Sequence, residues 1–88
     1  MESMYEIMAL LRAARALVGL HQQELADRAG VSRQVIVRIE GSERGIQLSA
    51  IDKVRKALQR EGVVFLPSTS FHGPGIAMKE RKEENDGR

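Results

Sequence analysis

The sequence of 88 residues predicts a mainly α-helical domain of four helices followed by a short β segment. Three observations predict this fold class. Apolar residues recur every three or four positions in four stretches, which is the spacing of one face of a helix. Glycines follow or separate these stretches, and glycine often ends a helix because it accepts a left-handed backbone. After Gly62 the chain changes to an unbroken apolar run, Val63 to Leu66, which is typical of a strand.

The composition limits the classes of protein to consider. The chain has the size of one small domain, and it contains no cysteine, so neither a disulfide nor a thiolate zinc site can form. Only His21 and His72 could ligate a metal as imidazoles, and we expect no metal, cofactor or small-molecule ligand. Arg12 and Arg15 interrupt the apolar opening stretch, which is neither a signal peptide nor a membrane span. We therefore expect a cytoplasmic protein.

The charge balance alone does not indicate a partner. The 14 basic and 12 acidic residues give a net charge of +2, which is too small to favour nucleic acid by itself. Whether the protein binds nucleic acid must therefore be judged from the positions of the charges along the chain.

The first predicted helix runs from Tyr5 to Val18 and ends at Gly19. Its expected buried face consists of Ile7, Leu10, Leu11, Ala14, Leu17 and Val18. Arg12 and Arg15 lie off this face. They are either solvated or in contact with a DNA phosphate.

Residues 22–40 predict two short helices joined by a tight turn. Leu25, Ala26 and Ala29 share one side of the first of these helices, and Gly30 follows where it would end. The small side chain of Ala26 allows the two helices to cross closely.

The second helix of the pair starts after Ser32, whose side-chain oxygen can accept a hydrogen bond from a free N–H group of the first turn. Ile36 and Ile39 share its buried face, and Val31 closes the turn beneath them. The two helices therefore share one apolar core.

The other face of this helix carries Arg33, Gln34, Val37 and Arg38. Arginine can donate two parallel hydrogen bonds to guanine, glutamine can exchange two with adenine, and valine can pack on a thymine methyl group. This set favours reading of bases in a DNA major groove. For Arg38, an ion pair with Glu40 or a neighbouring acid is the alternative.

A fourth helix is predicted after a loop at residues 41–47, with Leu48, Ile51, Val54 and Leu58 on its buried face. Arg44 is the only cation in that loop. It could contact a DNA phosphate or be solvated.

Residues 62–78 are predicted to form a β segment, with strands at 63–66 and 76–80. Alternation in the first strand places apolar side chains on both of its faces, and a lone ribbon cannot cover both. We therefore expect a dimerisation element. Its contacts are assigned to Val63, Val64, Phe65, Leu66, Ile76 and Met78. The alternative is a hairpin that folds back on its own helices.

The last ten residues, 79–88, contain four basic and four acidic side chains and no apolar one, and they predict a disordered tail.

The helix pair resembles the helix-turn-helix of the lambda-repressor-like, or XRE, family of bacterial and phage regulators over about residues 5 to 60. The resemblance rests on the joint spacing of Gln22, Ala26, Gly30, Val31, Ser32, Ile36, Ile39 and Glu40. One departure is His21, where the family prefers threonine or serine as the helix cap.

The resemblance implies a DNA-binding domain at residues 1–61 and a role for each matching residue. Base readers would be Arg33 and Gln34, with Val37 and Arg38 reading bases or touching the backbone. Contacts to the DNA backbone would come from Gln22, Ser32 and Arg44, and Gln22 would also brace Gln34.

The expected function is that of a sequence-specific DNA-binding transcriptional regulator. The simplest form is a nucleoid-associated repressor that binds double-stranded DNA at an inverted-repeat operator as a homodimer. A DNA-binding antitoxin is one alternative. A protein-interaction module that binds no DNA is another, but Arg33 and Arg38 argue against it, because an acidic face would then be expected. We expect no enzyme, since no Ser-His-Asp set or paired carboxylates are apparent.

Overall fold

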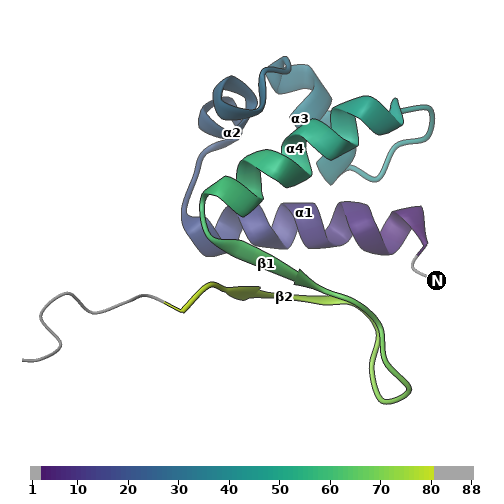
Figure 1. Cartoon of the computed structure of the whole chain (residues 1–88). Coiled ribbons are helices and arrows are strands. Elements are labelled where there is room, and N and C mark those ends of the chain that lie inside the picture. The colour runs from purple at the N-terminus through teal and green to yellow at the C-terminus, as the bar shows by residue number, and fades with distance from the viewer. Residues whose placement is uncertain (1–2, 81–88) are drawn as a thin grey trace, which may run out of the picture.

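The computed structural model describes residues 3–80, which form four helices and one two-stranded antiparallel sheet (Figure 1). The helices are α1 (Met4–Val18), α2 (Gln22–Ala29), α3 (Arg33–Glu40) and α4 (Leu48–Arg60), and the strands are β1 (Val63–Leu66) and β2 (Gly75–Met78). The predicted fold class is confirmed. No helix in this range is long and apolar enough to cross a membrane. From residue 81 onward, the predicted tail lies outside the described residues.

The first helix begins with a capping box. The Ser3 hydroxyl accepts a hydrogen bond from the Glu6 N–H at 3.1 Å, and the Glu6 carboxylate accepts one from the Ser3 N–H at 3.0 Å. The helix ends at Gly19, whose φ of 77° is left-handed. These contacts satisfy backbone groups that have no partner inside the helix.

The buried strips of α1 and α4 are centred differently from the prediction. Leu17 and Leu48, both expected in the core, are 49% and 68% exposed. Each lies six residues from a residue at the centre of the buried strip, Leu11 in α1 and Val54 in α4. Six residues correspond to about 120° around a helix, so these two leucines fall outside the covered strip. Met8, which was not predicted, is buried instead.

The helix pair α2 and α3 has the predicted construction. Gly30 ends α2 in a left-handed conformation with φ of 73°, and the Ser32 hydroxyl accepts a hydrogen bond from the Val35 N–H at 3.3 Å. Ala26 is fully buried, together with Ile36 and Ile39. A larger side chain at position 26 would therefore overpack the crossing of the helices.

The first turn of α2 is capped without the threonine or serine that the resembling family prefers at position 21. The backbone N–H of His21 donates to the Glu24 carboxylate at 2.7 Å. Glu24 in the first turn thus supplies a capping contact, and its negative charge also suits the amino end of a helix.

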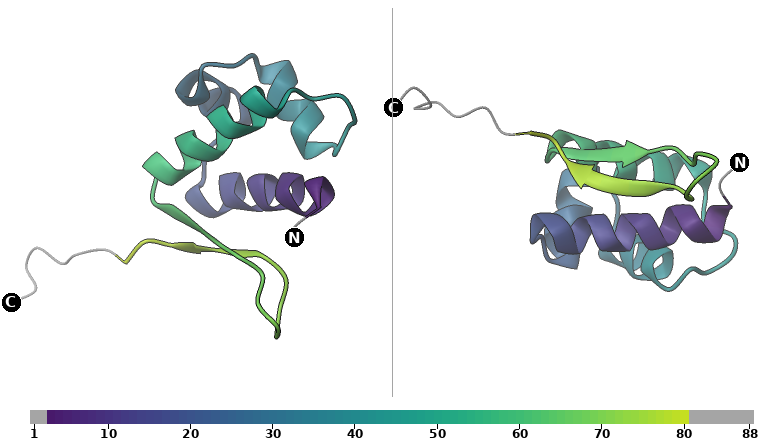
Figure 2. Two further views of the ribbon diagram at one scale, coloured as in Figure 1. Left: turned by 45° about the vertical axis from the view of Figure 1, so that its right-hand side comes forward. Right: turned by 90° about the horizontal axis from the view of Figure 1, so that it is seen from below.

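The β segment folds back on its own helices as a hairpin. Antiparallel pairing joins Val63 to Met78 and Phe65 to Ile76, and β1 packs along α4 while β2 lies along α1 (Figure 2). Val63 is only 3% exposed, and Phe65 and Ile76 pack against the same core. The predicted contact of Val63 with a second chain is therefore wrong, because its own helices already cover it.

The opposite face of the hairpin has no cover within the described residues. Val64 and Leu66 are exposed on this outer face, and Met78 is exposed at the end of the ribbon. Of the residues assigned to dimerisation, these three are the most exposed, and Phe65 and Ile76 are partly buried.

Candidate nucleic-acid interface

The candidate interface lies on the outer side of α3. Its inner side is fixed by Ile36 and Ile39, which are each 1% exposed. Arg33 and Gln34, in the first turn, are exposed. The helix thus presents a guanidinium and an amide to solvent from a rigid support.

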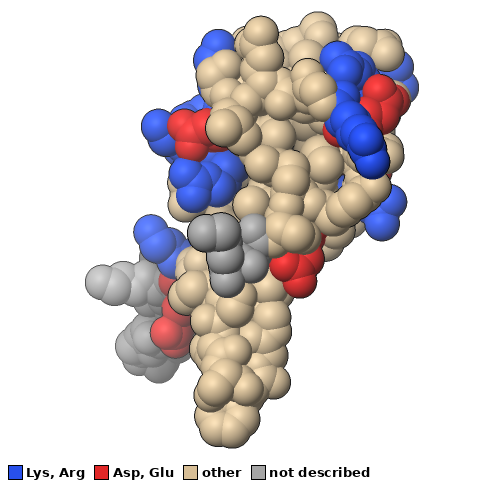
Figure 3. All heavy atoms as spheres, turned by 90° about the vertical axis from the view of Figure 1, so that its right-hand side faces the viewer, with Lys and Arg blue, Asp and Glu red and all other residues tan. Residues whose placement is uncertain are grey.

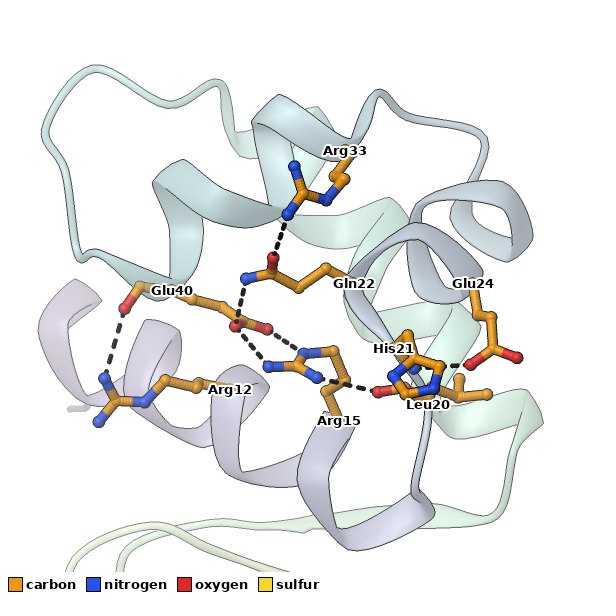
Figure 4. A network of polar contacts seen from close by, with 8 residues as sticks. All are labelled: Arg12, Arg15, Leu20, His21, Gln22, Glu24, Arg33 and Glu40. Carbon is orange, nitrogen blue, oxygen red and sulfur yellow. Dashed lines mark hydrogen bonds and ion pairs between the residues drawn. The ribbon is translucent and has the colours of Figure 1, made fainter.

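A chain of polar contacts links Arg33 to α1 and α2 (Figure 4). Arg33 Nη2 donates to Gln22 Oε1 at 3.3 Å, and Gln22 Nε2 donates to Glu40 Oε1 at 3.1 Å. Arg15 binds both oxygens of Glu40, with Nε at 2.6 Å from Oε2 and Nη2 at 2.8 Å from Oε1. We call these four residues the Glu40 network. It joins one side chain from α1, one from α2 and two from α3.

Burial makes the centre of this network strong. The Glu40 side chain is 8% exposed and the Arg15 side chain 21% exposed, so water competes little for their two parallel hydrogen bonds. The hydrogen bond with Glu40 raises the pKa of Arg15, because the carboxylate stabilises the charged guanidinium. A third bond, from Arg15 Nη1 to the Leu20 carbonyl at 2.9 Å, fixes the arginine to the start of the helix pair.

Two of the predicted roles change as a result, those of Arg15 and Gln22, and the prediction for Arg12 stays open. Arg15 is neither solvated nor free to bind a phosphate, because Glu40 and Leu20 occupy it. Arg12 is exposed, but it donates to the Glu40 carbonyl in a long contact of 3.5 Å. Gln22 braces Arg33 and not Gln34.

Arg38 lies differently from Arg33. Its Nε pairs with the Glu43 carboxylate at 3.1 Å, and its Nη2 donates to the Arg44 carbonyl at 3.3 Å. The predicted alternative, an ion pair with a neighbouring acid, is therefore present in the free protein. Val37 is half-buried. Base reading by Val37 and Arg38 stays a prediction, and Arg38 would have to leave Glu43 first.

The loop after α3 has a defined shape. Ser42 takes a left-handed conformation with φ of 55°, and Gly45 follows with φ of 80°. Arg38 holds this loop through the Arg44 carbonyl. The Arg44 side chain is exposed and, within residues 3–80, has no hydrogen bond or ion pair. It is therefore available to a phosphate.

Replacing Arg44 by alanine should weaken binding to all DNA sequences alike. One lost phosphate contact should lower the slope of log affinity against log salt by about one unit. The control is Lys56→Ala, which removes a cation from the exposed outer side of α4 and should leave the slope unchanged. Titrations at several salt concentrations measure both slopes, and an unaltered slope for Arg44→Ala would mean that this side chain is only solvated.

The geometry defines a class of protein. Two short helices cross at a tight turn, and the second presents side chains that can bond to base edges while its other side is buried. This is the arrangement by which helix-turn-helix proteins place a recognition helix in the major groove.

Comparison with known proteins agrees with this class. The helix-turn-helix family model matches residues 11–65. An uncharacterized HTH-type transcriptional regulator of Methanothermobacter thermautotrophicus is 39% identical over 54 residues, which cover 61% of this chain and 78% of that protein. The chain belongs to the XRE-type helix-turn-helix family.

Proposed function

We propose that this protein is a DNA-binding transcriptional regulator that reads a specific sequence with Arg33 and Gln34. The main support for the proposal is that α3 has one side buried in the core and one side exposed to solvent. The inner side is fixed by the core and the Glu40 network, and the outer side exposes a guanidinium and an amide. These are the groups best suited to guanine and adenine in the major groove.

Three further residues support contact with the DNA backbone. Gln22 lies beside Arg33, Ser32 caps the same helix, and Arg44 projects from the loop that follows it. Contacts of this kind position a protein on the duplex without reading sequence.

The finer form of the proposal is a repressor that occupies an inverted-repeat operator as a homodimer. Occupation of a promoter needs no activity besides binding. A two-fold dimer would present two copies of Arg33 and Gln34, and an operator with the same symmetry would match them.

Selection from a random duplex pool tests this proposal. We expect an inverted repeat whose half-site centres are about one helical turn, roughly 34 Å, or a multiple of it apart. Enrichment of single asymmetric sites would contradict the dimer. If no sequence is enriched and binding is equal for all duplexes, specific reading by α3 is wrong. If no duplex binds, a protein-interaction module is the better account of the fold.

A further inference from the structure

An apolar groove lies between α1, α4 and the hairpin. Its volume is about 420 Å³, which is large enough for an aromatic side chain. Its apolar lining includes Met4, Ile7, Leu10, Leu48, Phe65 and Pro74. The two charged residues that line it, Asp52 and Arg55, pair with each other at 2.8 Å. The groove is therefore suited to an apolar occupant that brings no charge.

The far end of the hairpin carries an exposed aromatic residue. Phe71 is 93% exposed, although the turn that holds it is well ordered by hydrogen bonds. The Thr69 N–H donates to the His72 carbonyl at 2.8 Å, and the Phe71 N–H donates to the Thr69 hydroxyl at 3.0 Å. A phenylalanine usually buries roughly 150–250 Å² in a core or an interface. This one is held outward and is not covered by its own groove.

The whole hairpin is free of formal charge. Residues 62–78 contain no Asp, Glu, Lys or Arg, in a chain in which 30% of the residues are charged. Figure 3 shows the projecting end of the hairpin as a surface without acidic or basic side chains. Depletion of charge together with aromatic residues is the composition of the buried centre of a protein interface.

We propose that the groove of one copy receives Phe71 of a second copy, and that the exchange is reciprocal. The inference rests on the homodimer proposed above and names the contact that forms it. A two-fold interface requires a projecting group and its receptor on the same surface of one molecule. The hairpin carries both parts, because Phe65 and Pro74 line the groove and Phe71 lies on the turn between them.

The size of the contact sets its strength. Two buried phenylalanines remove roughly 300–500 Å² from water, and the groove walls that cover them add a similar area, so the contact falls below the roughly 1,200–2,000 Å² of stable interfaces. The dimer should therefore be reversible and depend on concentration. A duplex with two half-sites would then favour its assembly.

Sedimentation velocity of the full chain over a range of concentrations tests the contact. Phe71→Ser should raise the dimer dissociation constant at least about tenfold. At concentrations where the parent and the variant are both monomeric, the melting temperature of Phe71→Ser should equal that of the parent, because the side chain makes no core contact. The matched control is Leu17→Ser, an exposed apolar residue at the other end of α1, and it should dimerise like the parent.

Mixing two variants tests reciprocity. Leu48→Asp places a charge at the groove and should also weaken the dimer. An equimolar mixture of Leu48→Asp and Phe71→Ser keeps one intact groove facing one intact Phe71, so it should associate more tightly than either variant alone. No such gain would overturn the reciprocal exchange, as would a Phe71→Ser protein that dimerises normally. A small molecule found in the groove by native mass spectrometry, with the protein monomeric, would overturn it as well.

The same variants separate this inference from the proposed function. Phe71→Ser should keep the parent's affinity for a duplex with one half-site and lose affinity for the full operator. If the parent dimerises through Phe71 but binds no DNA, the proposed function fails and the contact stands. If the operator is bound and Phe71→Ser has no effect on assembly, the contact fails and the function stands.

Discussion

Replacing Glu40 by alanine should lower the free energy of unfolding by about 2–4 kcal/mol and weaken specific DNA binding as well. Loss of one member of a buried ion pair typically costs about 3–5 kcal/mol, and the partial exposure of Arg15 reduces that range here. Binding falls because Gln22 loses the carboxylate that orients it toward Arg33. Urea unfolding measures the first effect, and titration of a selected operator measures the second.

A double variant separates the two effects. Arg15→Met with Glu40→Met replaces the ion pair by apolar side chains, which often restores stability. It should recover most of the lost unfolding free energy but not the lost operator affinity, because Gln22 still lacks its acceptor. A Glu40→Ala protein that loses less than about 0.5 kcal/mol would show that the pair is not a structural contact of the kind described.

The contribution of Arg15 should not depend on pH near neutrality. Its folded-state pKa is raised by the hydrogen bond with Glu40. A group whose pKa is higher in the folded state contributes its full stabilisation when the pH is below the pKa of the unfolded state. This stabilisation is lost only when the pH rises through the pKa of the folded state. For an arginine both values lie far above the physiological range.

Replacing Arg33 by alanine should reduce affinity for the selected operator by about 1–3 kcal/mol, which is roughly 5- to 150-fold. The loss should concentrate on one base pair per half-site, since the guanidinium can bond to one guanine. Gln34→Ala should relax preference at a different base pair. Affinities for the operator and for single-base variants of it measure both effects.

Gln22→Ala is the matched control for position 33. It removes the brace and a proposed contact to the DNA backbone but leaves the guanidinium, so it should weaken binding to all sequences and relax the preference at the Arg33 base pair less than Arg33→Ala does. If Arg33→Ala weakens random and specific DNA equally, Arg33 binds a phosphate and its role as a base reader is wrong.

The helices and turns could be predicted from local patterns. Gly30 and Ser32 determine where α2 ends and α3 begins through backbone conformation and capping, which depend on adjacent residues only. The spacing of apolar residues indicated that α1 and α4 each bury one face. It did not indicate which residue lies at the centre of that face. Leu17 and Leu48 were misplaced because the centre depends on which neighbours cover each helix.

The polar part of the site could be predicted only in part. Arg15 and Glu40 are 25 positions apart, and no local pattern relates them until α1 and α3 pack together. The only signal was the place of Glu40 at the end of the motif. The outward positions of Arg33 and Gln34 did follow from the helical spacing of Ile36 and Ile39. Their contacts with DNA stay predictions.

The hairpin was open to two interpretations because strand alternation shows that two faces are apolar but not what covers them. The structure places the helices over Val63 and Phe65 and leaves Val64 and Leu66 outside. A truncation after Glu61 would therefore remove part of the core along with the exposed face. Single substitutions on the outer side are the cleaner test of assembly.

The two exposed residues of α3 differ in how freely they can be exchanged. Arg33 is tied through Gln22 to a buried carboxylate, so a replacement there also disturbs the scaffold. Gln34 forms no side-chain hydrogen bond within residues 3–80. A library randomised at position 34 should therefore yield proteins of equal stability with different DNA preferences. Redesign of target choice in this protein would best begin at that position.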